Sequence, residues 1–251
     1  MAVQKPRAPL SRDRVLAAAV ALADAEGIPA LTMRRLAARL GVEAMSLYHY
    51  LPAKEALLDG LVEAVVAELH AAVGEPPPGN GEQDDGTDDG TDDGTDWRTV
   101  LRSRFLAARQ VMLRHPWMPA LLGTRRRVPV GIYAYYDQLV GTLAGAGFPY
   151  RLAHRAIHAF GSLPLGFAQE VFSPAPAGAG TESAQADVAD TGTTDTGRAA
   201  MAEALPHLTA MVASEIHDAA DPTLGWCDSQ TEFEFTLDLL LDGLERLRPR
   251  S

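Results

Sequence analysis

Two histidines, His154 and His158, are spaced so that they could bind a metal ion together. Side chains four residues apart share one face of a helix, and neutral imidazole is a common metal ligand. Glu170 follows and could add a carboxylate, which would be typical of a helical metal-dependent enzyme. No third ligand lies close to the pair in sequence, and helical histidines are more often surface or core residues. The metal enzyme therefore stays an alternative, and we expect no metal and no cofactor.

The rest of the chain lacks the recognisable sequence signatures of enzymes. It has no glycine-rich phosphate loop, no G-x-S-x-G nucleophile turn and no H-E-x-x-H zinc motif. We assign no catalytic residue and predict that the protein is not an enzyme.

A second group of side chains, between positions 43 and 50, suits contact with DNA. Hydroxyl groups can bind phosphates, small or apolar groups can contact thymine methyls, and an imidazole can reach a phosphate or a base edge. Arg34 and Lys54 flank the group and could bind phosphates. The side chains that a short helix here would leave free of packing are Ala44, Met45, Ser46, Tyr48 and His49.

The residues before this group predict the helix and turn that would present it. Thr32 can cap a helix in which Met33, Leu36, Ala37 and Leu40 form one apolar stripe. Gly41 can adopt the positive φ of a sharp turn, and Ala37 is small enough for a second helix to cross closely. This spacing is typical of a helix-turn-helix, although an ordinary small helical bundle would also fit it.

The distribution of charge favours an anionic partner for the N-terminal part. The chain has a net charge of −11, but residues 1–54 hold eight Lys or Arg against four Asp or Glu. They therefore carry +4, which leaves −15 for the remainder, and nine of those negative charges lie in residues 75–96. A basic unit on an acidic chain is typical of nucleic-acid binding.

Two low-complexity stretches divide the chain into three helical pieces. Residues 75–96, with a repeated DDGT, predict an extended acidic linker, and residues 173–197 predict a flexible loop. The linker is either a passive insertion, which we favour, or a competitor of DNA for the basic unit. The fold class is all-α with about nine or ten helices and no strand. The helices are expected at 12–26, 33–40, 43–50, 53–73, 97–114, between Pro116 and Gly123, and at 129–146, 149–172 and 230–247.

Composition limits the broad class of protein. The 251 residues are 47% hydrophobic, and no apolar run reaches the length of a membrane span. The N-terminus lacks the apolar region of a signal peptide. Cys227 is the single cysteine, which excludes an intramolecular disulfide. We expect a cytoplasmic protein with no membrane partner.

The stretch "GIPALTMRRLAARLGVEAMSLYHYLPAKEALLDGL" resembles the DNA-binding domain of the tetracycline-repressor (TetR) family, with motif matches from Leu31 to Leu61. The segments 96–125, 146–170 and 233–247 resemble the ligand-binding core of the tetracycline repressor's own branch. The resemblance implies a homodimeric regulator, usually a repressor, that a small-molecule inducer releases from a double-stranded DNA operator. It also implies a helix-turn-helix domain at 1–56 and a helical ligand-binding and dimerisation domain at 57–251.

The resemblance also implies site residues. By motif, the family touches DNA at Thr32, Arg34, Ser46, Tyr48, His49, Tyr50 and Lys54. Ala44 and Met45 replace polar or rigid residues that read bases in the tetracycline repressor, so its operator does not transfer. That repressor binds a magnesium–drug chelate through a histidine before a G-T-R segment, where this chain has Leu121 and Leu122. The substitution argues against a tetracycline–magnesium ligand.

Residues 101–170 hold a mixture of aromatic and polar side chains that suits a ligand pocket. The candidates are Phe105, Arg109, Met112, Trp117, Tyr133, Tyr136, His154, His158, Phe167 and Glu170. The helices at 150–172 and 230–247 carry more apolar residues than one face needs, which favours a four-helix dimer interface. A DNA-binding architectural protein without a ligand is a further alternative, but a core of about 130 helical residues exceeds what dimerisation needs.

Overall fold

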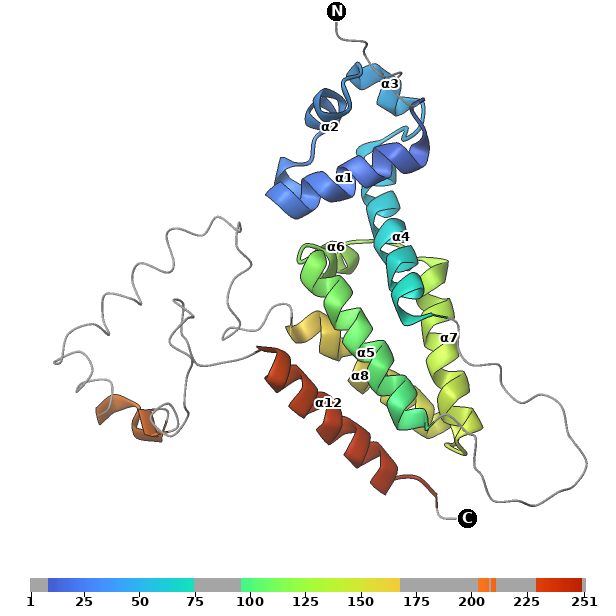
Figure 1. The fold of residues 1–251 in the computed structure, drawn as a ribbon, viewed down its shortest axis with the longest axis vertical. Helices are drawn as coiled ribbons and strands as arrows, with labels where there is room; N and C mark the ends of the chain where they lie inside the picture. The colour runs from blue at the N-terminus through green and yellow to red at the C-terminus, as the bar shows by residue number, and fades with distance from the viewer. Residues whose placement is uncertain (1–8, 75–95, 168–202, 208, 211–228, 250–251) are drawn as a thin grey trace, which may run out of the picture. The chain divides into compact units, whose positions relative to one another are not determined.

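The computed structural model describes residues 9–74, 96–167, 203–207, 209–210 and 229–249 (Figure 1). The chain forms two compact units, one of residues 1–168 with 236–251 and one of residues 169–235. No strand occurs in the described ranges, which confirms the predicted all-α class. The predicted linker 75–96, apart from Asp96, and the predicted loop 173–197 lie outside the described residues.

The N-terminal helices are set by local caps and a shared apolar core. They are α1 (Arg12–Glu26), a short 3-10 turn η1 (Ile28–Ala30), α2 (Met33–Leu40) and α3 (Ala44–Tyr48). The Ser11 hydroxyl accepts a hydrogen bond from the Arg14 amide, and Gly27 ends α1 with a φ of 76°. Val15, Leu36 and Leu47 are fully buried where the three helices meet. The apolar stripe of each short helix is therefore used inside this small bundle.

Helix α4 (Lys54–Val73) is apolar on more than one face and is covered on both sides. Its N-terminal half packs against α1, where an added Cβ on Gly60 would lie 2.6 Å from a Leu16 methyl group. Its C-terminal half packs against α5 and α7, and Figure 1 shows α1–α3 around one end of α4 and these helices beside the other. One continuous helix thus belongs to both the N-terminal bundle and the core.

The core consists of α5 (Trp97–Arg114), α6 (Met118–Gly123), α7 (Val130–Gly145), α8 (Tyr150–Gly166) and, from Thr236 on, α12 (Ser229–Arg246). Asp96 caps α5, since its carboxylate accepts a hydrogen bond from the Arg98 amide. Arg102 pairs with Asp238 across 3.1 Å, which joins α5 to the part of α12 in the same unit. Helix α8 ends at Gly166, six residues before the predicted end, and the remaining predicted residues after Phe167 lie outside the described ranges.

No helix among the described residues is long and apolar enough to cross a membrane.

Candidate DNA-binding surface and ligand cavity

The turn between α2 and α3 has the conformation that its glycine predicts. Gly41 adopts the left-handed region with φ 68° and ψ 39°. The Val42 amide donates to the Ala37 carbonyl over 3.1 Å, and the Gly41 amide donates to the Ala38 carbonyl over 3.2 Å. These two hydrogen bonds end α2 in the Schellman arrangement. The predicted helix-turn-helix is therefore present in its backbone geometry.

The short helix α3 presents a solvent-exposed face. Met45 is 75% exposed and Tyr48 is 41% exposed, whereas Leu47 between them is buried. Ser46 and His49 are also exposed, and Ala44 is half-buried. Met45 and Tyr48 lie on the same short helix as the exposed hydroxyl of Ser46, a mixture of groups that can contact bases and phosphates. This face could enter a DNA major groove.

The candidate cations differ in their surroundings. Arg34 and Lys54 are exposed and have no hydrogen bond or ion pair within the described residues. Arg35, the neighbour of Arg34, pairs instead with Glu26. Its guanidinium therefore ties α2 to the end of α1, while Arg34 stays free to bind a phosphate.

Two other predicted DNA-contact residues have structural partners. The Thr32 hydroxyl accepts a hydrogen bond from the Arg35 amide over 3.2 Å and caps α2. The Tyr50 hydroxyl donates to the Leu10 carbonyl over 2.9 Å and holds the segment before α1. The Thr32 hydroxyl therefore fixes the start of α2, and the Tyr50 hydroxyl fixes the chain before α1 next to the end of α3.

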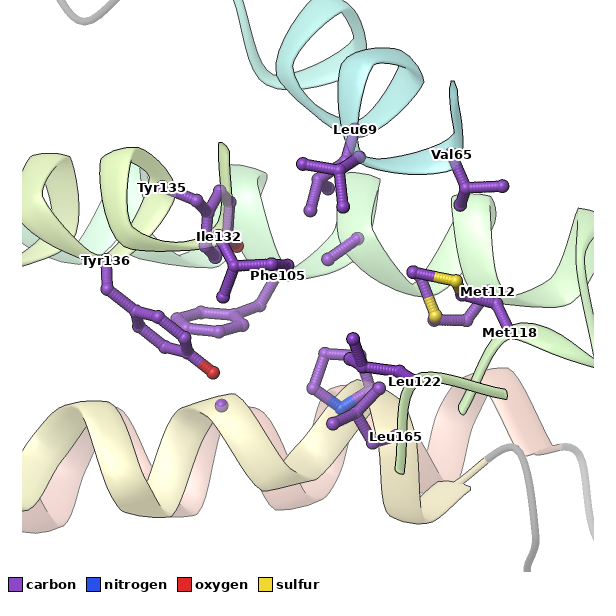
Figure 2. Close-up of a pocket in the computed structure, with 14 residues that line it drawn as sticks. Val65, Leu69, Phe105, Met112, Met118, Leu122, Ile132, Tyr135, Tyr136 and Leu165 are labelled. Atoms are coloured by element: carbon purple, nitrogen blue, oxygen red, sulfur yellow. The ribbon is translucent and has the colours of Figure 1, made fainter. Parts of the chain in front are cut away.

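An apolar cavity lies between α4, α5, α6, α7 and α8 (Figure 2). It holds about 570 Å³ of empty space, part of it open to solvent. Among the described residues its wall has no charged side chain. The lining residues are Val65, Val66, Leu69, Phe105, Ala108, Met112, Met118, Leu122, Ile132, Tyr135, Tyr136, Gly161, Pro164 and Leu165.

Three of the ten predicted pocket residues line this cavity, namely Phe105, Met112 and Tyr136. Tyr133 does not, because the inward stripe of α7 is formed by Ile132, Tyr135 and Tyr136 and leaves Tyr133 62% exposed. None of the predicted pocket residues came from α4, although Val65, Val66 and Leu69 of this helix line the cavity. Its apolar residues on more than one face were the signal that it needs two partners and could form a wall.

Arg109 and Trp117 are buried but are used elsewhere. The Arg109 guanidinium lies 5.7 Å from the centre of the half-buried Phe167 ring, and neither residue lines the cavity. The Trp117 indole donates to Asp24 over 2.7 Å and so faces α1.

The histidine pair lies on the exposed face of α8, outside the cavity. His154 and His158 are exposed, and their Nε2 atoms lie 3.0 Å apart. No cluster of three or more His, Cys, Asp or Glu in the described ranges could hold a metal ion. Glu170, the third predicted ligand, lies outside the described residues. The pair faces outward because the buried stripe of α8 runs through Ala153, Ala156 and Phe160.

Tyr135 is the most enclosed polar side chain of the cavity wall. It is 5% exposed, and burial raises the pKa of its hydroxyl well above the ordinary range. The buried Arg104 lies on the same side of the core, and its guanidinium donates to Gln138 over 2.8 Å. Tyr135 therefore stays neutral and can act as a hydrogen-bond donor.

Polar contacts join the cavity region to the N-terminal bundle. His115, at the end of α5, lies between the carboxylates of Asp24 on α1 and Glu68 on α4, at 2.8 and 2.9 Å. Arg125, after α6, pairs with Glu55 at 2.8 Å and with Asp59 at 3.4 Å near the start of α4. A movement of α4 would have to change these contacts.

Comparison with known families places both halves of the chain. Residues 15–61 match the family "Bacterial regulatory proteins, tetR family". Residues 90–248 match "Tetracyclin repressor-like, C-terminal domain".

Two curated relatives carry names of transcriptional regulators. An HTH-type transcriptional regulator of Saccharopolyspora erythraea is 32% identical over 139 residues, which are 55% of this chain and 51% of the relative. The HTH-type transcriptional repressor DrrR1 of Streptomyces coeruleorubidus is 37% identical over 113 residues, 45% of this chain and 36% of the relative. The matched parts thus span about half or less of these relatives.

Two solved structures share the fold over nearly the whole chain. A possible TetR family transcriptional regulator from Streptomyces coelicolor A3(2) has a TM-score of 0.66 and 29% identity, and covers 95% of this chain and 100% of its own. The TetR family protein ActR of Streptomyces coelicolor, in complex with actinorhodin, has a TM-score of 0.63 and 25% identity, with 97% and 100% covered. These matches are to regulators, and the metal-enzyme alternative is not supported.

Proposed function

Because this chain belongs to the tetR family of bacterial regulatory proteins, we propose that it is a ligand-responsive, homodimeric repressor of transcription. The observation that carries the proposal is that α4 belongs both to the N-terminal bundle and to the wall of the cavity. Its N-terminal half packs against α1 of the N-terminal bundle, and its other end, at Val65, Val66 and Leu69, forms a wall of the cavity. A small molecule in the cavity would contact the helix that supports the DNA-binding bundle.

In this proposal α3 enters the major groove of an operator. Met45 and Tyr48 face the bases, and Arg34 and Lys54 bind phosphates on either side. The role places the protein in the cytoplasm, where the operator is.

A dimer would read a palindrome whose half-sites lie about one helical turn, or about 34 Å, apart. A single α3 is only five residues long and reaches few base pairs, so a second copy is needed for specificity. Exposed apolar side chains on α8 and α12 support a dimer interface there. They include Tyr150 on α8 and Leu239 on α12, which are 74% and 51% exposed, and Leu247 directly after α12 is 64% exposed.

The inducer would act by a shift in population. A ligand that binds more tightly when α4 is tilted would move the two α3 helices out of register with the operator. The differential affinity needed is typically about 1–3 kcal/mol. The complex of the similar protein ActR with actinorhodin supports a small molecule in this role.

The test is a selection of binding sites from random double-stranded oligonucleotides, followed by anisotropy titrations at several salt concentrations. We expect an enriched palindrome whose binding is lost in Tyr48→Ala. Arg34→Gln should reduce the slope of log affinity against log salt by about one per protomer. Each phosphate contact that is lost means that about one counterion fewer is released from the DNA on binding.

Arg35→Gln is the matched control, because it removes the same charge from a side chain that pairs with Glu26. Its salt slope should change less than that of Arg34→Gln. No enriched sequence, or equal slopes in both variants together with full binding by Tyr48→Ala, would contradict the proposal.

A further inference from the structure

The Tyr135 hydroxyl is buried in the described structure without a hydrogen-bond partner. Tyr135 comes from α7, is 5% exposed and lines the cavity (Figure 2). Buried tyrosine hydroxyls usually have a partner, because a donor that is removed from water without a new hydrogen bond destabilises the folded state. The missing partner is therefore informative about what the cavity takes.

The rest of the cavity wall has no charged group that could pair with a charged ligand. Its other described residues are aliphatic or aromatic, apart from the second hydroxyl on Tyr136 and the sulfur atoms of Met112 and Met118. The nearby guanidinium of Arg104 is hydrogen-bonded to Gln138 and does not line the cavity. A charged ligand would lose its hydration here without an ionic partner, which is strongly unfavourable.

The same wall suits ring systems. Phe105 stacks on Phe160 with centroids 5.2 Å apart and meets the Tyr135 ring edge-on at 6.5 Å. Figure 2 shows the rings of Phe105 and Tyr136 on one side of the cavity and the sulfur atoms of Met112 and Met118 on another. Aromatic faces and thioethers both make favourable contacts with ring compounds.

We propose that the cavity binds an uncharged, largely apolar ring compound that carries a hydrogen-bond acceptor, and that the Tyr135 hydroxyl donates to this acceptor. This rests on the proposed function, since it names the chemical class of the inducer and the residue that selects it. The acceptor would be a carbonyl or an ether oxygen. Tyr135 thereby separates such compounds from hydrocarbons of the same shape.

The test uses three probes with one ring skeleton: 9-fluorenone, which has a carbonyl acceptor, fluorene, which has none, and the anion fluorene-9-carboxylate. Equilibrium dialysis gives the dissociation constant of each for the wild type, Tyr135→Phe and Tyr133→Phe. Tyr133 is the matched control, because it is an exposed tyrosine on the same helix outside the cavity. We expect the preference of the wild type for fluorenone over fluorene to fall about five- to tenfold in Tyr135→Phe, as for one lost hydrogen bond. Tyr133→Phe should keep the wild-type preference.

Thermal unfolding without any probe is the second measurement. Removal of an unpartnered hydroxyl should leave the midpoint of Tyr135→Phe equal to or above that of the wild type. A clearly lower midpoint would mean that the hydroxyl has a partner inside the protein and would overturn the proposal. An unchanged preference in Tyr135→Phe, binding of the carboxylate as tight as that of fluorenone, or no binding of either neutral probe would also overturn it. Binding of the selected DNA is measured on the same preparations of all three proteins. Absence of DNA binding by the wild type would count against the proposed function and not against the role of Tyr135 in ligand binding.

Discussion

The imidazole Nδ1 of His115 lies 2.8 Å from a carboxylate oxygen of Asp24, which joins the end of α5 to α1. The other ring nitrogen lies 2.9 Å from Glu68 on α4, and the Trp117 indole donates to the same oxygen of Asp24. A protonated imidazole can donate to both carboxylates at once. The imidazole of His115 is shielded from water, whereas the side chains of Asp24 and Glu68 are 31% and 39% exposed, so solvent reaches the carboxylate side of the contact.

This contact predicts a measurable coupling between His115 and Asp24. Each of His115→Asn and Asp24→Asn should lower the free energy of unfolding by about 1–3 kcal/mol, because a hydrogen bond to a charged group is lost. The double variant should lose less than the sum, with a coupling energy of about 0.5–3 kcal/mol from urea unfolding. Asp137→Asn is the control, since this exposed carboxylate on α7 has no ion pair in the described structure. Its effect should add to that of His115→Asn, and additivity in the Asp24 cycle as well would contradict the prediction.

Arg125 should hold the start of α4 in place. Its side chain is 10% exposed and pairs with the exposed carboxylates of Glu55 and Asp59, so Arg125→Gln removes two ion pairs from the first turns of that helix. We expect amide hydrogen exchange of residues 54–60 to become about two- to fivefold faster, as for a loss of about 0.5–1 kcal/mol of local stability from solvent-screened ion pairs. Arg126→Gln, at an exposed neighbouring arginine, should leave these rates unchanged. Equal rates in the two variants would mean that Arg125 does not restrain α4.

Two glycines of α7 should respond to alanine in opposite directions. A Cβ on Gly131 would lie 2.5 Å from a methyl group of Val66, a buried β-branched residue of α4 that lines the cavity. Gly131→Ala should therefore lower the free energy of unfolding by about 1–3 kcal/mol. Gly141 has open space at the same position, so Gly141→Ala should raise it by about 0.5–1 kcal/mol through helix propensity. Calorimetry or urea unfolding distinguishes the two, and a shared sign would contradict the close approach of α4 and α7.

The hydrogen bonds of Glu68 predict a loss of stability in acid. Burial acts to raise the pKa of this carboxyl, but hydrogen bonds and charge from His115 and Arg114 outweigh it, and the pKa falls below its ordinary value of 4.5. A carboxyl whose pKa is lowered in the folded state stabilises it above the ordinary pKa and loses that effect as pH falls through the folded value. The difference in free energy of unfolding between wild type and Glu68→Gln should therefore be largest near pH 6 and shrink below about pH 4.5. The change should be modest because the side chain is 39% exposed, and a difference independent of pH would contradict it.

The sequence by itself determined the features whose causes lie within a few residues. Thr32 caps its helix as predicted, and Ser11 and Asp96 cap theirs in the same way, since a cap needs only its own side chain and an amide two or three positions later. The left-handed turn at Gly41 follows from a glycine after an apolar stripe. The same local patterns gave the helix class and the exposed face of α3.

Only the tertiary structure decided which side chains meet across the core. The rotation of α7 about its axis sends Tyr135 inward and leaves Tyr133 exposed, although Tyr133 and not Tyr135 was predicted as a pocket residue. Trp117 faces Asp24, 93 positions away in sequence, and α4 supplies a wall of the cavity that no motif announced. A helical pattern defines which residues share a face, but not which helix covers that face. That choice depends on the packing of all the helices together.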